Sequence, residues 1–173
     1  EGKTITICRK TFPSLRATVM RDFLDILKTH NIYSETDHNK SNSEYNLKNN
    51  LVEFISLDIP QKVRGRKRQL LYINEANEIN KEDWQQLIFR TEEQVILDYN
   101  PSDEYHFIYD DILTRKDCDF YVTTYKDNPF LDPKIRIEIE RLKETDETYW
   151  QIYGLGQKGV SKATIFNFSE SKV

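Results

Sequence analysis

The stretch that most constrains the fold of this chain is residues 69–78, where a short apolar segment ends abruptly in polar and acidic residues. The segment, residues 70–73, reads Leu-Leu-Tyr-Ile. A short apolar run followed by turn residues is typical of a strand buried on both faces. Such strands occur mostly in parallel α/β sheets, where ligands bind at the carboxyl ends of the strands. The sequence therefore predicts an α/β fold with Asn74 and Glu75 at the ligand-binding edge.

This stretch alone leaves two interpretations of Asn74 and Glu75 open. In nucleotide-hydrolysing motors, the first polar residue after such a strand holds the Mg²⁺ shell and the following glutamate positions the attacking water. Alternatively, both residues only cap the strand and lead into a loop, because short motif matches also arise by chance. The rest of the chain bears on this choice.

The overall composition excludes several classes of protein. The chain has 173 residues, 38% hydrophobic and 31% charged, which is enough for one domain with a substantial core. Its formal charge of -4 argues against a dedicated nucleic-acid-binding module, so any DNA contact must come from a local patch or from other parts of the protein. The longest apolar runs are far too short to span a membrane. The distant pair Cys8 and Cys118, with no secretory pattern, suggests reduced thiols and an intracellular setting.

The hydrophobic pattern predicts alternating strands and helices, with no interior domain boundary. Strands are expected at residues 4–9, 51–57, 70–73, 94–98 and 120–125, with a hairpin partner around Tyr45 and Leu47. Helices are expected from Pro13 to about His30, after the cap Asn80, from Pro133 to about Lys143, and over residues 145–153. Residues 163–168 are either a last strand or a linker.

Three of the expected strands end in residues whose side chains can bind a ligand or take part in a reaction: Arg9-Lys10, Asn74-Glu75 and Asn100-Pro101. In a parallel sheet these ends converge on one edge. A guanidinium, an ammonium, a carboxylate and an amide in one crevice suit a polyphosphate and its metal ion. The three histidines, by contrast, show no ligand spacing with a cysteine or with one another.

Four segments in order resemble the ATPase domain of the large terminase subunit of tailed bacteriophages. Residues 9–16 (Arg-Lys-Thr-Phe-Pro-Ser-Leu-Arg) are similar to the segment that follows the P-loop helix in that family. Residues 71–76 resemble its Walker B segment, and residues 98–101 its coupling motif. Residues 149–156 resemble the end of the ATPase domain. The resemblance implies a RecA-like P-loop fold with a mostly parallel sheet flanked by helices.

The resemblance also implies site residues for ATP and Mg²⁺. Glu75 would orient the attacking water, Asn74 would lie at the metal shell, and Asn100 would sense the γ-phosphate. Arg9 would contribute to nucleotide binding. Arg64, in the basic run of residues 62–68, is the best match to an arginine finger that acts on a neighbouring subunit's nucleotide. Arg64 as a solvated loop arginine is an equal alternative.

The implied organisation is a partial ATPase domain over residues 1–156. Residues 157–173 would be an exit linker or the start of a following nuclease domain. The implied role is powering the packaging of viral DNA into the procapsid, in the cytoplasm of the bacterial host. Double-stranded DNA, the portal protein and the small terminase subunit are the implied partners, and no membrane is involved.

Two departures from the family pattern affect these expectations. No Gly-rich segment followed by Gly-Lys-Ser or Gly-Lys-Thr is present, so the N-terminal part is expected to be missing and the fragment itself inactive. Asn74 also stands where the family usually has aspartate. An alternative function follows: a catalytically dead α/β relic or interaction domain from a decayed prophage. The family's P-loop strand lies inside the sheet, so we also expect unpaired strand edges, and either self-association by strand exchange between copies or a rearranged sheet.

Overall fold

The computed structural model describes residues 2–58 and 66–159, and its contacts divide the chain into two compact units. The first unit ends at Tyr99 and the second begins at Asn100. The predicted ATPase domain over residues 1–156 stays a prediction. The boundary follows the end of a strand and precedes Pro101, which restricts the residue before it to extended backbone and interrupts regular structure.

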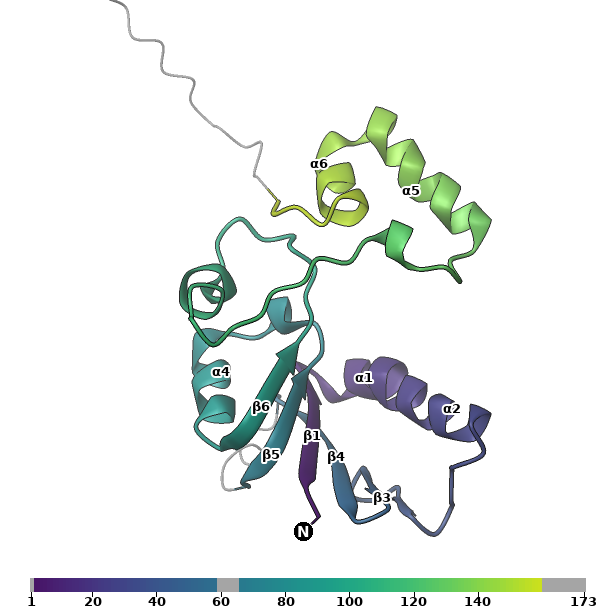
Figure 1. Cartoon of the computed structure of the whole chain (residues 1–173), viewed down its shortest axis with the longest axis vertical. Coiled ribbons are helices and arrows are strands. Elements are labelled where there is room, and N and C mark those ends of the chain that lie inside the picture. The colour runs from purple at the N-terminus through teal and green to yellow at the C-terminus, as the bar shows by residue number, and fades with distance from the viewer. Residues whose placement is uncertain (1, 59–65, 160–173) are drawn as a thin grey trace, which may run out of the picture. The chain divides into compact units, whose positions relative to one another are not determined.

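The first unit is built on a six-stranded sheet in the order β2-β3-β4-β1-β5-β6 (Figure 1). Its strands are β1 (Thr4–Arg9), β2 (His38–Asn39), β3 (Glu44–Leu47), β4 (Asn50–Ser56), β5 (Arg68–Ile73) and β6 (Thr91–Leu97). Strands β4, β1, β5 and β6 are parallel, whereas β2 and β3 are antiparallel. This confirms the predicted α/β class with a mostly parallel sheet, and each strand expected up to residue 98 is present.

The sheet has no internal gap among the described strands. β4, β1, β5 and β6 are direct neighbours, and β6 forms one edge. Every described strand up to β6 pairs with another strand of the same chain. The edge at β6 is the kind of unpaired edge that favours pairing with another chain, and self-association stays a prediction.

One face of the sheet is covered by a continuous helical segment. It comprises α1 (Phe12–Leu15), a π-helical turn η1 (Arg16–Met20) and α2 (Arg21–Thr29), as predicted from the period of its apolar residues. Buried side chains from these helices and from β1, β3 and β4 form one core cluster: Ile7, Leu15, Met20, Leu27, Tyr45, Val52 and Phe54. Proline at the first helical turn suits this start, because the missing N–H is not needed there.

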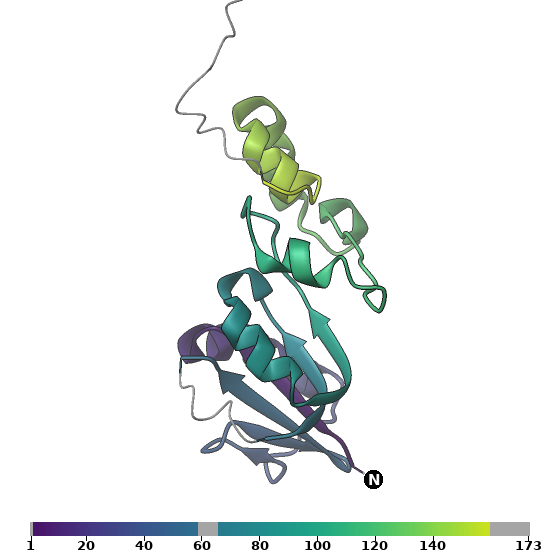
Figure 2. The same ribbon diagram turned by 90° about the vertical axis from the view of Figure 1, so that its left-hand side faces the viewer.

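The opposite face of the sheet carries α4 (Lys81–Ile88), as Figures 1 and 2 show. Asn80 caps this helix in a reciprocal capping box with Asp83, which confirms the predicted cap. Asp83 also accepts a hydrogen bond from Lys10 Nζ at 2.8 Å. This ion pair links the start of α4 to the end of β1, so the loop after β5 is held between two fixed elements.

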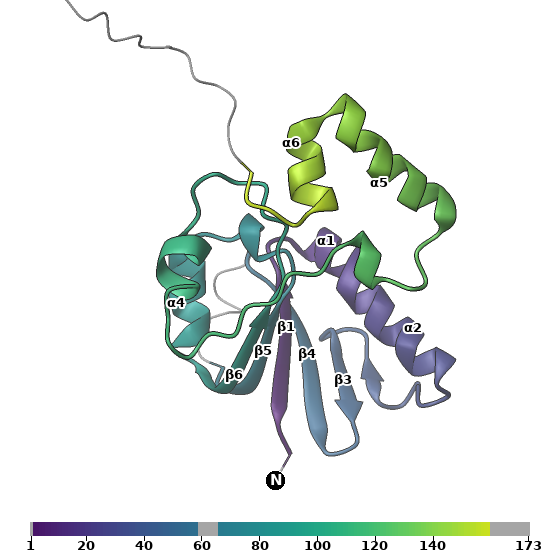
Figure 3. The ribbon, with the colours of Figure 1, turned by 45° about the horizontal axis from the view of Figure 1, so that its top comes forward.

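The second unit consists of short helical elements, seen again in Figure 3. They are η3 (Ile108–Ile112), η4 (Tyr125–Asp127), α5 (Pro133–Thr145), α6 (Glu147–Tyr149) and η5 (Trp150–Gly154). Trp150 is buried beside Tyr125, with ring centroids 6.0 Å apart, and Lys143 lies over its ring. The predicted helix start at Pro133 and the helical segment before Gly154 are confirmed.

The strand predicted at residues 120–125 is wrong. Residues 120–124 have no assigned strand, and Phe120, Tyr121 and Val122 are more than half exposed. Their alternating, β-branched pattern favours extended backbone, but a strand also needs a neighbour, and none pairs with this segment in the described chain. None of the helices in the described residues combines the length and hydropathy of a membrane span.

Candidate functional site

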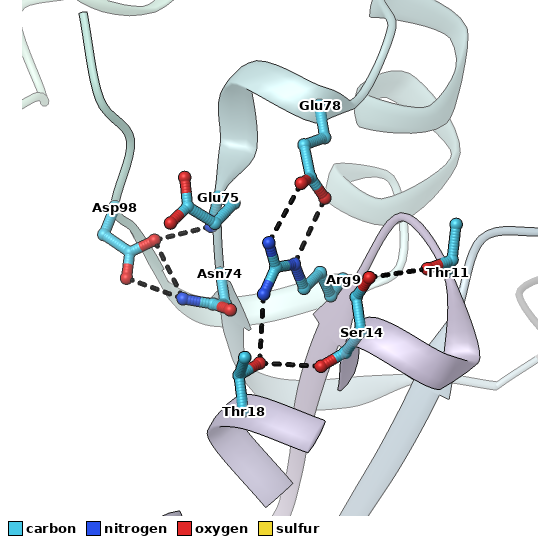
Figure 4. Close-up of polar contacts among 8 residues, drawn as sticks. All are labelled: Arg9, Thr11, Ser14, Thr18, Asn74, Glu75, Glu78 and Asp98. Carbon is cyan, nitrogen blue, oxygen red and sulfur yellow. Dashed lines mark hydrogen bonds and ion pairs between the residues drawn. The ribbon is translucent and has the colours of Figure 1, made fainter. Parts of the chain in front are cut away.

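Three adjacent strands of the first unit end together and bring polar side chains into one group (Figure 4). Arg9 is the last residue of β1, Asn74 follows β5, and Asp98 follows β6. Backbone hydrogen bonds continue past the strand ends, since Asn74 N donates to Cys8 O at 2.9 Å and Asp98 N donates to Ile73 O at 3.1 Å. The strand-end residues are therefore positioned by the sheet itself.

The carboxylate of Asp98 is the centre of the hydrogen bonds in this group. Its Oδ2 accepts from the Tyr72 hydroxyl at 2.6 Å and from Asn74 Nδ2 at 3.1 Å. Its Oδ1 accepts from the Glu75 backbone N–H at 2.6 Å. Hydrogen bonds to an ionised acceptor are stronger than neutral ones. Asp98 thus fixes both the amide of Asn74 and the backbone of Glu75.

Glu75 has an unusual backbone conformation, with φ 54° and ψ 57°. This is the left-handed region, which costs a residue with a Cβ about 1–2 kcal/mol. Residues held in such conformations concentrate at functional sites, where the surrounding structure compensates for the strain. The turn directs the chain from β5 into the short helix η2 (Ala76–Glu78).

The environment of Glu75 raises the pKa of its carboxyl group. Burial is the main cause, and the negative charge of Asp98 adds to it, followed by a smaller contribution from Glu78. The positive charge of Arg9 acts in the opposite direction. A carboxylate with a raised pKa is a stronger base, which is the property required of a group that accepts or orients a proton.

Arg9 is held beside this group by three side-chain contacts. Its Nε and Nη2 donate to the two carboxylate oxygens of Glu78 at 3.1 and 2.9 Å. Its Nη1 donates to Thr18 Oγ1 at 3.0 Å. The Glu78 hydrogen bond and the negative charges of Glu78, Glu75 and Asp98 raise the pKa of Arg9, so it remains a cation. These contacts leave two of the five guanidinium N–H groups unused by Glu78 and Thr18.

Asn74 presents two different atoms to this group. Its Nδ2 faces Asp98, whereas its Oδ1 is buried and accepts no hydrogen bond within the described structure. A buried acceptor without a donor is unfavourable and indicates a partner that the described residues do not supply. The described residues contain no cluster of three His, Cys, Asp or Glu side chains that could hold a metal ion. Within the described residues, the Asn74 amide oxygen is thus a buried acceptor without a donor.

The structure brings together some of the residues that the sequence singles out, and adds others. Arg9, Asn74 and Glu75 lie in one group. Asn100 belongs to the second unit, and Arg64 lies outside the described residues. Sequence reasoning missed the roles of Asp98 and Glu78. Asp98 had a signal, because it follows β6 as Asn74 follows β5, within the segment of residues 98–101 compared with the coupling motif.

Comparison with known protein families agrees with this geometry. The family model described as phage terminase large subunit matches residues 1–157. The chain belongs to the phage terminase large subunit family. This confirms the resemblance that the four sequence segments carry. No curated protein matches the chain.

Solved structures of large terminases have the same fold as this chain. The large terminase from a thermophilic bacteriophage matches with a TM-score of 0.75 and 18% identity, over 92% of this chain and 41% of that one. Its complex with ADP matches with a TM-score of 0.74 and 19% identity, over 90% and 40% of the two chains. Its complex with ATP-gamma-S matches with a TM-score of 0.72, 20% identity and the same coverage. The chain thus spans about two fifths of these terminases.

Replacing Glu75 with glutamine is expected to raise the melting temperature at pH 7 by about 1–3 °C. The folded-state pKa of Glu75 is raised, so its contribution to stability is complete below the ordinary glutamate pKa and is lost as pH rises through the folded value. Glutamine does not titrate, so the gain should disappear at pH 4. Thermal melts at both pH values measure this. Glu82→Gln, at the exposed first turn of α4, is the control and should give no gain at pH 7.

Proposed function

We propose that this chain is the ATPase domain of a phage terminase large subunit and powers the packaging of viral DNA into the procapsid. The observation that carries the proposal is Glu75, a carboxylate of raised pKa held in a left-handed turn at the carboxyl end of β5. The position is the one at which nucleotide-hydrolysing α/β proteins place the residue that orients water. Family membership and the nucleotide complexes of the thermophilic phage terminase support the same assignment.

The proposed reaction is hydrolysis of the phosphoanhydride bond between the β- and γ-phosphates of ATP. Glu75 would accept a hydrogen bond from the attacking water and hold it in line with the bond that breaks. Because its pKa is raised, the carboxylate is a better acceptor than an ordinary surface glutamate. Protonation at low pH would remove this function, so activity should fall as pH drops through the pKa of Glu75.

The residues present fit a Mg²⁺ ion that arrives with ATP. When bound, the ion would neutralise negative charge on the phosphates. Mg²⁺ keeps several of its waters in such sites, and the buried Oδ1 of Asn74 would accept a hydrogen bond from one of them. Arg9 is a second element for nucleotide binding, because its cation lies beside Glu75 and Asp98. Contact with phosphate would compete with its ion pair to Glu78.

The remaining roles are proposed from the family resemblance. Asn100 would sense the γ-phosphate and couple hydrolysis to motion, and Arg64 would act on the nucleotide of a neighbouring subunit. Residues 1–156 would belong to the ATPase domain, with residues 157–173 leading out of it. Double-stranded DNA, the portal protein and the small terminase subunit would be its partners in the host cytoplasm.

A second candidate function is a catalytically dead α/β domain that serves assembly or protein interaction. The observation that favours it is Asn74, an amide where the family usually has a carboxylate. The two candidates differ in their dependence on ATP, so turnover separates them.

ATP hydrolysis by the protein translated from the complete gene, compared with the 173-residue chain, tests the proposal. We expect Mg²⁺-dependent turnover from the complete product. We expect none from the chain alone, because its 173 residues contain no Gly-rich loop whose backbone N–H groups could bind the β- and γ-phosphates. A complete product without turnover would support the dead-domain alternative. Turnover by the chain alone would show that a different phosphate site is in use.

A further inference from the structure

The backbone hydrogen bonds between β5 and β6 change partner at Glu75. In a regular parallel pair, the N–H and the C=O of one residue bond to two residues of the neighbouring strand. These two residues lie on either side of the residue paired with it. Asp98 N donates to Ile73 O, so the regular continuation would have Asp98 O accept from Glu75 N. Instead Asp98 O accepts from Ala76 N at 2.7 Å. The left-handed turn at Glu75 therefore removes one N–H from the ladder.

The side chain of Asp98 supplies the acceptor that this N–H has lost. Its Oδ1 lies 2.6 Å from Glu75 N, and its backbone oxygen binds the next amide along. The same residue thus holds both ends of the turn, through its carboxylate on Glu75 and its main chain on Ala76. We propose that Asp98 is the positioning residue that locks the backbone of Glu75 in its left-handed conformation and so aims its carboxylate. This inference rests on the proposed role of Glu75 in hydrolysis.

Two further contacts make Asp98 suited to this task. Tyr72 and Asn74 both donate to its Oδ2, which fixes the orientation of the carboxylate plane. With Oδ2 occupied, Oδ1 is directed at the Glu75 N–H. Both donors come from the same strand end as Glu75, so the carboxylate clamps one continuous segment, residues 72–75.

The negative charge of Asp98 has a second effect on the same residue. It lies close enough to raise the pKa of Glu75. Geometry and charge can be separated by substitution. Asp98→Asn keeps an oxygen for the Glu75 N–H but removes the charge, and Asn74 can turn its amide so that Oδ1 accepts from the new NH₂ group. Asp98→Ala removes both the oxygen and the charge.

Residue-resolved amide hydrogen exchange in the full chain tests the positioning role without any assay of activity. In Asp98→Ala, the Glu75 amide should exchange at least about tenfold faster than in Asp98→Asn, because only alanine leaves it without an acceptor. The Ala76 amide is the internal control, since its acceptor is the backbone oxygen of residue 98 and survives both changes. Tyr72→Phe removes one of the two donors to Asp98 Oδ2 but leaves Asn74 to orient the carboxylate, so the Glu75 amide should stay protected.

Steady-state kinetics of the protein from the complete gene provides the second measurement. Asp98→Ala should lower kcat by about a hundredfold with little change in KM for ATP, because a misdirected carboxylate loses alignment and not nucleotide binding. Asp98→Asn should retain most of kcat and shift the acid limb of the pH profile to lower pH. A purely structural role of Asp98 would not change the pH at which activity falls on the acid side of the profile.

The outcomes distinguish this inference from the proposed function. Equal protection of the Glu75 amide in the alanine and asparagine variants would overturn the positioning role, whatever the kinetics. Loss of kcat in Asp98→Asn equal to that in Asp98→Ala would also overturn it, because the retained oxygen would then be irrelevant. If Glu75→Gln leaves turnover intact while exchange behaves as expected, the proposed role of Glu75 fails and the clamp on its backbone stands.

Discussion

Glu75→Gln is expected to reduce the ATP turnover of the protein from the complete gene by about 10³-fold. Glutamine has the same shape and keeps the backbone N–H that Asp98 binds, so the turn should be preserved. It loses the carboxylate charge and the ability to accept a proton from water. The expected loss therefore appears in kcat, with nucleotide affinity close to that of the unchanged protein.

Single-turnover hydrolysis and nucleotide titration measure these two quantities separately. Glu82→Gln makes the same chemical change on the exposed first turn of α4 and should leave turnover within about twofold, as surface substitutions usually do. A Glu75→Gln protein that keeps more than a tenth of the original rate would contradict the assignment of Glu75. A parallel loss of nucleotide affinity would point to disruption of the site.

The sheet and its helices were predictable because their signals are local. The apolar run of residues 70–73 between turn residues identifies β5, and the pattern after Pro13 identifies the helix that covers one face. Asn80 and Asp83 form the cap that their spacing suggests. The convergence of Arg9 and Asn74 on one edge follows from the direction of parallel strands alone.

The decisive contacts of the site were not predictable, because they depend on register between distant segments. Asp98 reaches Glu75 only because Ile73 pairs with Leu97 in the sheet. Glu78 meets Arg9 only through the turn at Glu75. The alternating sequence pattern also predicts a strand at residues 120–125 that is not present, since alternation does not guarantee a partner strand. The resemblance included residues 98–101 as a segment of interest but directed attention to Asn100 within it.

Asn74 illustrates how a neighbouring strand alters the meaning of a substitution. Considered alone, an asparagine at this position lacks the charge that favours Mg²⁺. In the structure a carboxylate is already present, because Asp98 lies beside it and accepts its NH₂ group at 3.1 and 3.3 Å. Restoring aspartate at position 74 would therefore place two carboxylates side by side and remove the donor between them.

Asn74→Asp is accordingly expected to destabilise the metal-free chain at pH 7 by roughly 2 kcal/mol, through loss of a hydrogen bond to a charged group and repulsion between like charges. One of the two carboxyl groups should have a raised pKa, so the lost stability should return as pH falls and the pair takes up a proton. Denaturant unfolding at pH 7 and pH 5, with and without Mg²⁺, measures this effect. Mg²⁺ should stabilise the aspartate variant more than the unchanged chain, because it neutralises the added charge.

The exchange variant Asn74→Asp with Asp98→Asn is the sharpest control for this prediction. It restores one amide and one carboxylate with donor and acceptor reversed, and the amide oxygen introduced at position 98 can still accept the Glu75 N–H. The double variant should therefore be more stable than the sum of the two single changes predicts, by at least about 1 kcal/mol in a double-mutant cycle. Additive effects would mean that residues 74 and 98 do not interact in solution, and the hydrogen-bonded group around Asp98 would then be incorrect.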